Sequence, residues 1–219
     1  MAKIEITNED NMVLMKRYPD KYFDLAIVDP PYGIDVGNDA RNGLMMKKAA
    51  TKRKDYAKKD WDKGVPNEDY FKELFRVSKE QIIWGVNYYP YSFLSGGRIY
   101  WDKDTAEGYT NSDGELAFYS KSNSLKSFKC RWNGMLQYDM KNKEERIHPT
   151  QKPIRLYEWL LDNYAKTGDK ILDTHLGSGS IALACHNRGF DLVACELDTD
   201  YYNNALKRLK THQQQLTMF

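Results

Sequence analysis

The sequence is poor in cysteine, nearly neutral overall and without long apolar runs, and each shortage excludes a class of protein. Its three cysteines, an odd number at wide spacing, make neither a disulfide framework nor a metal site. Cys185 and Cys195 stand among apolar residues, which predicts buried, reduced thiols. No apolar run is long enough to span a membrane, and we expect no signal peptide. These features favour a cytoplasmic protein without a bound metal.

The net charge is only +2, which excludes a uniformly basic nucleic-acid binder. The basic residues are instead concentrated in two stretches. Residues 47–63 hold eight basic and three acidic side chains, and residues 121–146 hold seven basic and three acidic ones. Either stretch could meet phosphate groups, or could form an ordinary solvated surface. Composition alone leaves both interpretations open.

Hydrophobic periodicity predicts an α/β protein. Short apolar runs predict strands at 23–28, 81–84, 98–101, 115–119, 170–173 and 190–195. Helical spacing of apolar residues predicts helices at 67–77, 154–165, 180–188 and 200–213. We expect Asn67 to begin the first of these helices, Asp198 or Thr199 to begin the last, and Gly189 to end the third. This alternation predicts a doubly wound, mainly parallel sheet.

Two long stretches, 33–66 and 108–147, show no sustained period. Long irregular segments within a compact domain are usually functional. We therefore expect a single domain over residues 1–219, with these two insertions for contact with nucleic acid and a short tail at 214–219.

A glycine-containing turn follows the predicted strand 170–173 and opens the predicted helix 180–188. Gly177 and Gly179 allow a ligand to approach the backbone, where the first helix amides are free. Glu196 ends the next strand, where a carboxylate can accept both hydroxyls of a ribose. The turn and the carboxylate together predict a ligand that contains adenosine.

The same turn also satisfies a relaxed dinucleotide fingerprint, because Ala182 takes the place of its third glycine. A nicotinamide oxidoreductase is therefore an alternative from this segment alone. Two features weigh against it. Residues 173–176 make the connection longer than the tight dinucleotide turn, and the late position of the motif leaves one mononucleotide half instead of two.

Asp29-Pro30-Pro31-Tyr32 directly follows the predicted strand 23–28, at the edge of the sheet where α/β proteins bind ligands. The two prolines hold the backbone rigid. The Asp29 carboxylate and the Pro30 carbonyl can accept the two N–H groups of an exocyclic amine, which directs the nitrogen lone pair outward. Tyr32 can stack on the base that carries this amine. The tetrapeptide thus predicts an amine that attacks an electrophilic methyl group.

This tetrapeptide, the later glycine turn and the segment His148-Pro149-Thr150-Gln151-Lys152-Pro153 resemble the β-group of DNA amino-methyltransferases. In that family the catalytic motif precedes the cofactor motif, a permuted order that this chain shares. The resemblance extends from about residue 8 to about residue 209. It implies a Rossmann-like methyltransferase fold and S-adenosyl-L-methionine as the cofactor. The chain departs from the family pattern at His175, where Phe is common, and we expect His175 simply to pack there.

The resemblance also implies roles for individual residues. It assigns catalysis to Asp29, Pro30, Pro31 and Tyr32. It assigns cofactor binding to Asp10, Asp29, His148, Thr150, Lys152, Asp173, Gly177, Ser178, Gly179, Ser180 and Glu196. Lys152 is expected near the cofactor carboxylate, with solvation at a helix start as its alternative, and Glu196 could instead cap the final helix.

The implied reaction is site-specific methylation of a base that is flipped out of double-stranded DNA. Asp at the first motif position favours adenine N6, and cytosine N4 is the alternative. A second alternative is a non-catalytic partner that binds only S-adenosylmethionine or nucleic acid. The predicted DNA contacts are Lys47, Lys48, Lys52, Arg53, Lys54, Arg131 and Trp132.

The last five residues, Gln215-Leu216-Thr217-Met218-Phe219, resemble the peptide that binds the bacterial sliding clamp. A free tail could place Leu216, Met218 and Phe219 in an apolar groove, with Gln215 at its edge. The alternative is a frayed helix end that packs back on the domain. Because the region available for DNA recognition is small, a homodimer that shares recognition is a further hypothesis.

Overall fold

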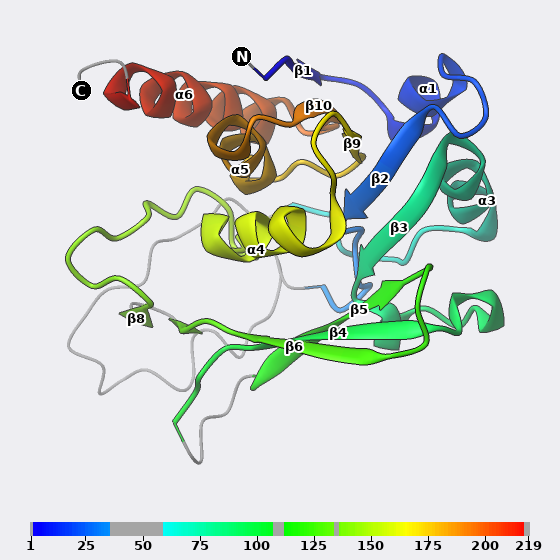
Figure 1. Ribbon diagram of the computed structural model, residues 1–219, viewed down its shortest axis with the longest axis horizontal. Helices are drawn as coiled ribbons and strands as arrows, with labels where there is room; N and C mark the ends of the chain where they lie inside the picture. The colour runs from blue at the N-terminus through cyan, green and yellow to red at the C-terminus, as the bar shows by residue number, and fades with distance from the viewer. Residues whose placement is uncertain (1, 36–58, 107–111, 134–135, 217–219) are drawn as a thin grey trace.

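The computed structural model describes residues 2–35, 59–106, 112–133 and 136–216. Within these residues, eight strands form one sheet in the order β1-β10-β9-β2-β3-β5-β4-β6 (Figure 1). Their bounds are Ile4–Thr7 (β1), Phe23–Val28 (β2), Ser78–Trp84 (β3), Gly97–Asp102 (β4), Gly114–Tyr119 (β5), Leu125–Lys129 (β6), Lys170–Asp173 (β9) and Asp191–Cys195 (β10). All neighbouring strands are parallel except β5, which runs antiparallel to both β3 and β4. The predicted α/β fold with a mainly parallel sheet is confirmed.

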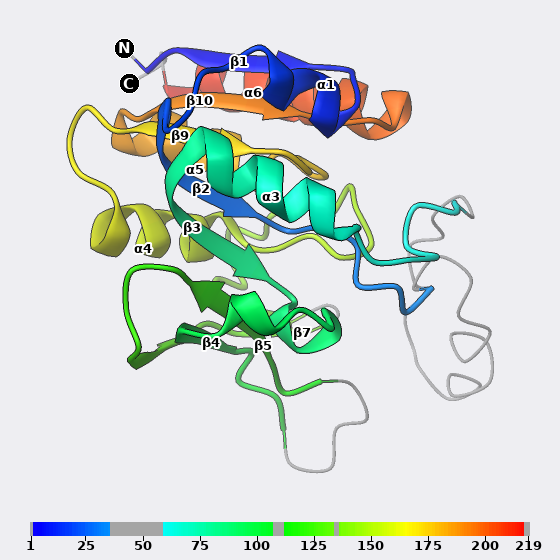
Figure 2. The ribbon, with the colours of Figure 1, turned by 90° about the vertical axis from the view of Figure 1, so that its right-hand side faces the viewer.

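Helices cover both faces of this sheet (Figure 2). Their bounds are Asn11–Lys16 (α1), Glu68–Val77 (α3), Ile154–Tyr164 (α4), Ser180–Arg188 (α5) and Thr199–Leu216 (α6). Alternate residues of β2 pack into different clusters. Leu25 and Ile27 join residues of α4, α5 and α6, whereas Ala26 and Val28 join residues of α1 and α3. Because both faces of the strand are buried, every residue of β2 except Asp24 is apolar.

The ends of the helices follow from local side chains. The Asn67 side chain accepts a hydrogen bond from the Tyr70 amide and begins α3. The Asp198 side chain accepts the amides of the next turn and begins α6. Gly189, at φ +78°, ends α5 in the left-handed conformation that favours glycine. These three predicted boundaries are confirmed.

The elements β1, α1 and β6 were not predicted, and the stretch 108–147 holds regular elements besides the strand that was predicted at 115–119. This stretch contains β6 and a short antiparallel pair, Trp132–Asn133 (β7) with Leu136–Gln137 (β8). Four of the five residues of β6 are exposed, so the strand has no apolar face that a sequence pattern could reveal. It joins the sheet as an edge strand beside β4.

Some predicted residues lie outside the described part of the chain: Lys47, Lys48, Lys52, Arg53, Lys54, Thr217, Met218 and Phe219. Gln215 and Leu216 belong to α6 and not to a free tail. The three cysteines are free, buried thiols. Among the described residues, no helix is long and apolar enough to cross a membrane, and no group of side chains is suited to hold a metal ion.

Candidate active site

Loops that follow three neighbouring strands meet at one edge of the sheet and enclose a cavity. Asp29 follows β2, Thr174 follows β9 and Glu196 follows β10, and all three line this cavity. Parallel strands bring their carboxyl ends to the same edge, so residues far apart in sequence come together. The cavity walls include eight of the predicted cofactor residues: Asp10, Asp29, His148, Thr150, Lys152, Gly177, Ser178 and Glu196.

The carboxylate of Glu196 is fixed by the backbone around it. The Gly177 amide donates to one oxygen at 2.8 Å, and the Asp198 amide donates to the other at 2.9 Å. Gly177 has φ +54°, a conformation that points its amide at the carboxylate with little strain only because it is glycine. Burial raises the pKa of Glu196. Each oxygen retains a second lone pair, so the carboxylate can still accept hydroxyl groups from a ligand in the cavity.

Three predicted cofactor residues lie behind the cavity wall and support it. Asp173 is buried and accepts the His175 amide at 2.9 Å, and burial raises the pKa of Asp173 to about 8. The Ser180 hydroxyl donates to the Lys152 carbonyl at 2.7 Å. Gly179 takes φ +71° where the turn enters α5. These residues shape the turn that carries the wall, and none of them lines the cavity.

His148 forms part of the wall as a neutral side chain. Its Nδ1 atom accepts from the Thr150 hydroxyl at 3.1 Å, and its ring lies 4.2 Å from the Tyr201 ring and 5.2 Å from the Trp61 ring, centre to centre. Burial lowers the pKa of His148 to about 3. An uncharged imidazole among aromatic rings provides a flat apolar wall with one polar edge.

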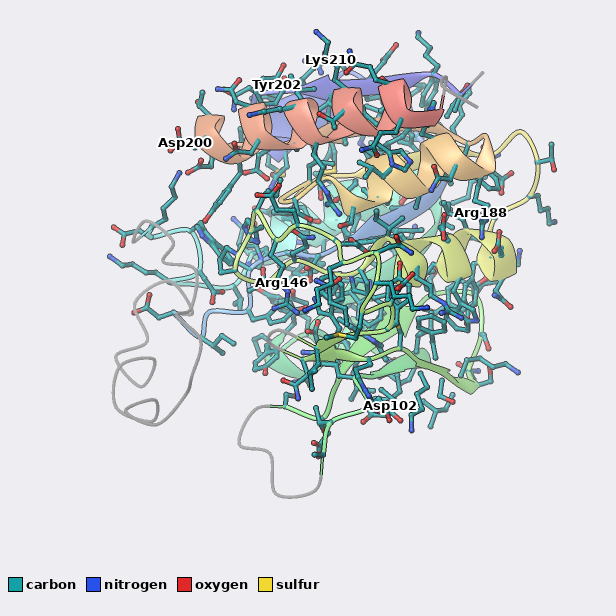
Figure 3. The ribbon with its side chains drawn as sticks, turned by 90° about the vertical axis from the view of Figure 1, so that its left-hand side faces the viewer. Asp102, Arg146, Arg188, Asp200, Tyr202 and Lys210 are labelled. Atoms are coloured by element: carbon teal, nitrogen blue, oxygen red, sulfur yellow. The ribbon has the colours of Figure 1, made fainter. Side chains whose placement is uncertain are left out.

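Trp61 lies on a short segment that no motif marked. Lys59 holds this segment to the start of α6 through ion pairs with Asp198 at 2.6 Å and Asp200 at 2.8 Å. Figure 3 shows Asp200 at the first turn of α6. The buried Asp62 carboxylate accepts the Tyr32 amide at 2.8 Å. The segment is therefore fixed both to the start of α6 and to the Asp-Pro-Pro-Tyr turn.

Asp29 is the centre of a partly buried group of charged side chains. Tyr32 donates its hydroxyl to Asp29 Oδ1 at 2.6 Å, and Lys152 donates to Asp29 Oδ2 at 2.5 Å. The same ammonium lies 2.9 Å from Glu115 Oε2 and 3.1 Å from the Tyr32 hydroxyl. Glu115 Oε1 in turn pairs with Lys103 at 2.7 Å. Two carboxylates and two ammonium groups thus alternate in a chain that ends at Asp29.

The pKa values of this group follow from burial and from their neighbours. Burial raises the pKa of Asp29, and Lys152 opposes this only in part. Burial also acts on Glu115, but Lys152 and Lys103 outweigh it and lower the pKa of Glu115 to about 2. Burial acts to lower the pKa of Lys152, but the two carboxylates outweigh it and hold the pKa above its usual value. Lys152 and Glu115 are therefore charged, and Asp29 is the carboxylate that protonates more easily.

Lys152 is not the solvated residue of a helix start, so that alternative is wrong. Its side chain is 2% exposed. Each of its three N–H groups faces an acceptor, on Asp29, Glu115 and Tyr32. This engagement argues against a direct bond from Lys152 to the carboxylate of a bound cofactor. Glu115, its second carboxylate partner, had no motif around it and was missed.

The ring of Tyr32 is already covered by protein. It stacks on Tyr88 with ring centres 4.9 Å apart and planes 11° apart. Gly85, at φ +76°, lies so close that a Cβ atom there would fall 2.1 Å from the Tyr32 ring. The ring face toward Tyr88 is therefore closed to a base, and the Tyr32 hydroxyl holds the Asp29 carboxylate in place.

The Pro30 carbonyl, the second predicted acceptor, receives a hydrogen bond from the buried Tyr89 hydroxyl at 3.0 Å. A carbonyl oxygen has two lone pairs, so one remains for an incoming N–H. Pro31 lines the cavity. The turn after β2 thus holds a carboxylate that lines the cavity and, behind it, a buried carbonyl, and each accepts a hydrogen bond from a tyrosine hydroxyl.

Asp10 and His175 also line the cavity. Asp10 begins α1 by accepting the Met12 amide at 2.8 Å. His175 packs against Tyr70, with ring centres 5.2 Å apart, and contacts Asn11 Nδ2 through its Nε2 atom at 3.1 Å. Burial lowers the pKa of His175 to about 4, so the ring is neutral. This is the packing position expected for it.

The two described residues that were predicted to contact DNA lie in different environments. Arg131 is exposed and pairs with Asp104 at 2.7 Å, so it is accessible to a phosphate. Trp132 is buried and donates its indole N–H to the Gln151 carbonyl at 2.6 Å. The prediction that Trp132 reads DNA is wrong, because its ring supports the segment that carries Lys152 from inside the core.

Comparison with known proteins finds DNA methyltransferases. A family model described as DNA methylase, for N6 and N4 methyltransferases, matches residues 93–207. Type II methyltransferase M2.DpnII of Streptococcus pneumoniae is 22% identical over 253 aligned positions, covering 97% of this chain and 91% of that protein. Type II methyltransferase M2.LlaDCHI of Lactococcus lactis subsp. cremoris is 23% identical, covering 93% and 88%.

Solved structures share the fold. The crystal structure of the M1.HpyAVI–SAM complex superposes with a TM-score of 0.60 at 21% identity, covering 94% of this chain and all of that one. The PvuII DNA methyltransferase, described as cytosine-N4-specific, superposes with a TM-score of 0.60 at 10% identity, covering 98% and 93%. At these identities the likeness concerns the arrangement of the backbone.

Proposed function

Because the chain belongs to the DNA methylase family of N6 and N4 amino-methyltransferases, we propose that it methylates adenine N6 at specific sites in double-stranded DNA. The protein is a DNA amino-methyltransferase that uses S-adenosylmethionine. One observation carries the proposal. Asp29, at the end of β2, opens into the same cavity as Glu196, at the end of β10. A carboxylate suited to an amine thus shares one space with a carboxylate suited to a ribose.

The residues of the cavity fit this cofactor. S-adenosylmethionine supplies, when bound, a methyl group on a positively charged sulfur. Glu196 would accept its ribose hydroxyls, and Asp10 would lie toward its adenine. Gly177 and Ser178 would hold the methionine end, where the glycine leaves room for a close approach to the backbone. The neutral His148 and the Trp61 ring would cover the ligand with apolar surface.

The residues around Asp29 would hold the target amine. Asp29 and the remaining lone pair of the Pro30 carbonyl would accept its two N–H groups, so that the nitrogen lone pair points toward the methyl group. A base stacked in a duplex cannot reach this edge of the sheet, so the target is flipped out. Asp29 is also the acceptor for the proton that the nitrogen sheds, because Glu115 remains ionised between two lysines.

Two finer features of the fold belong to the same proposal. We infer a permuted motif order within a single domain over residues 1–219. The last two strands of the chain, β9 and β10, lie between β1 and β2 in the sheet, which supports this order. The exposed Arg131, with the lysines and arginine of residues 47–54, would contact DNA phosphates. A homodimer and the clamp-binding tail at 215–219 stay predictions.

Nucleoside mass spectrometry of DNA from cells that express the protein tests the proposed function. We expect N6-methyladenine with the wild type and a loss of at least about 100-fold with Asp29→Ala, because that variant lacks an oriented acceptor. Asp24→Ala is the matched control, since Asp24 lies on the same strand but pairs with Lys79 at 2.6 Å. N4-methylcytosine instead would establish the cytosine alternative, and no modified base would favour a non-catalytic partner.

A further inference from the structure

Glu115 belongs to none of the motifs, yet its carboxylate lies within the charged group at Asp29. It comes from β5, the strand that runs antiparallel to its neighbours, and so approaches the site from the opposite chain direction to Asp29. Its Oε2 atom lies 2.9 Å from Lys152 Nζ and 3.1 Å from the Tyr32 hydroxyl, and its Oε1 atom lies 2.7 Å from Lys103 Nζ. It therefore contacts both groups that bind Asp29.

A direct pair between Lys152 and Asp29 alone would not suit an acceptor. An ammonium group that pairs with a single carboxylate stabilises the ionised form of that carboxylate strongly. The carboxylate then becomes a weaker acceptor of hydrogen bonds and protons. The contact between Lys152 and Asp29 is well shielded, because the lysine side chain is 2% exposed and that of Asp29 is 18% exposed. The screening that weakens surface pairs is therefore small here.

The second carboxylate changes this balance. We propose that Glu115 is a positioning residue that divides the charge of Lys152 and so keeps the Asp29 carboxylate available to the target amine. This inference rests on the proposed function, because it assigns Asp29 to the amine. In the reaction, the nitrogen forms a bond to the methyl carbon, the bond from that carbon to sulfur breaks, and one proton passes from nitrogen to Asp29. Glu115 touches none of these atoms.

The other groups around Asp29 do not carry this function. Six other titratable side chains interact electrostatically with Asp29: Lys152, Tyr32, Tyr70, Tyr89, Tyr157 and Asp173. The four tyrosines are neutral, since burial raises their pKa values. Asp173 points its carboxylate at the His175 amide. Among these described groups, Glu115 adds the second negative charge on Lys152.

The pH dependence of kcat tests this inference with a defined sign. Activity falls as pH drops and Asp29 becomes protonated. Glu115→Gln removes a negative charge, so that Asp29 becomes the only carboxylate paired with Lys152. The pKa of Asp29 therefore falls, and the acid limb of the pH profile of kcat moves to lower pH by about one unit. The plateau value of kcat falls about tenfold because the acceptor is weaker. The KM for S-adenosylmethionine stays within about twofold.

We expect Lys103→Met to shift the acid limb of the pH profile in the opposite direction. Without its outer ammonium, Glu115 draws more of the charge of Lys152, and the acid limb moves to higher pH. Glu80→Gln is the matched control, because Glu80 pairs with the exposed Lys121 and is not among the charged side chains around Asp29, so it should leave the profile unchanged. The assay is tritiated methyl transfer to DNA from a strain that lacks N6-methyladenine, at saturating cofactor.

The outcomes separate the two proposals. A wild type without methyl transfer to DNA would refute the proposed function. An active wild type with an unshifted acid limb in Glu115→Gln, or with equal shifts of the same sign in both variants, would refute the positioning role. If Glu115→Gln is too inactive to measure, the shift in Lys103→Met decides.

Discussion

At the scale of single residues, the cavity beside Asp29 and Glu196 is lined in part by side chains that come from outside the motifs. Trp61 lines the cavity and lies against His148, on a segment that the Lys59 ion pairs hold to α6. A half-buried indole in such a wall gives a flat ligand contact area without losing much conformational freedom. Trp61 should therefore contribute to cofactor affinity although it lies far in sequence from the glycine turn.

Replacing Trp61 tests this contribution. We expect Trp61→Ala to weaken binding of S-adenosylmethionine roughly tenfold, which equals about 1.4 kcal/mol, through the lost aromatic contact. Isothermal titration calorimetry measures the change. Trp159→Ala is the control, because Trp159 stacks on Phe128 in another part of the core and does not line the cavity. An unchanged affinity in Trp61→Ala would remove the residue from the binding site.

A residue's place in the site could be predicted from the sequence when a local motif determined it, and could not when packing between distant elements determined it. Asp29 and Glu196 could be identified from the sequence, because each stands at a strand end beside a recognisable turn. Lys152 could be identified as a site residue but not its partners, since the pairing with Glu115 depends on how β5 pairs with β3, the neighbour of β2. The prediction for Trp132 was wrong, because an aromatic residue in a basic stretch is equally typical of a DNA contact and of a core position.

At the scale of elements, the turn after β3 determines where the Asp-Pro-Pro-Tyr turn can lie. Gly85 follows β3 at φ +76° and packs against the Tyr32 ring, and Tyr88, the last residue of the short 3-10 helix Val86–Tyr88, stacks on that ring. The hydroxyl of Tyr32 then reaches Asp29 at 2.6 Å. One short turn on the neighbouring strand thus holds the Asp29 carboxylate in place through Tyr32.

A methyl group at Gly85 should disturb this arrangement. Gly85→Ala places a Cβ atom 2.1 Å from the Tyr32 ring and strains the backbone, so we expect a loss of about 2–4 kcal/mol in the free energy of unfolding. Gly168→Ala has the same kind of backbone strain, at φ +91°, with nothing within 4 Å, and should lose only about 1–2 kcal/mol. Urea denaturation compares the two. Equal losses would mean that the ring contact is unimportant.

Elements with an apolar face were predictable and those without one were not. The bounds of β2, β9 and α5 follow from apolar runs and from the glycine that ends α5. β6 is an exposed edge strand, and β1 is only half-buried along its length, so neither has a period to detect. Their pairing comes from hydrogen bonds to β4 and β10, which no local pattern encodes.

At the scale of the whole molecule, the cofactor cavity joins the two halves of the chain. Its walls come from the start of α1 and the turn after β2 near one end, and from the loops after β9 and β10 near the other. A ligand that contacts all of these stabilises the folded state as a whole. The order of the strands around the cavity could be predicted only through the family resemblance, because parallel pairing leaves no signal in local sequence.

Ligand binding should therefore raise the melting temperature. At a concentration of S-adenosylmethionine near 100 times its Kd, we expect about 2.7 kcal/mol of added stability and a shift of about 5–10 °C. Differential scanning fluorimetry measures this shift. NAD serves as the comparison ligand, since it tests the nicotinamide alternative directly. A shift with NAD equal to that with S-adenosylmethionine would count against the assignment of the cavity.

The position of β9 and β10 between β1 and β2 also affects how the protein is made. A ribosome releases β1 and β2 early, but the strands that pair with β1 and with one edge of β2 are synthesised last. Until then, the backbone N–H and C=O groups along that edge of β2 have no partner strand, and a chain cut short before residue 170 keeps them unpaired. Such fragments are natural targets for chaperones and proteases. The nascent enzyme cannot modify DNA before its sheet closes, so methylation begins only after β10 has been made.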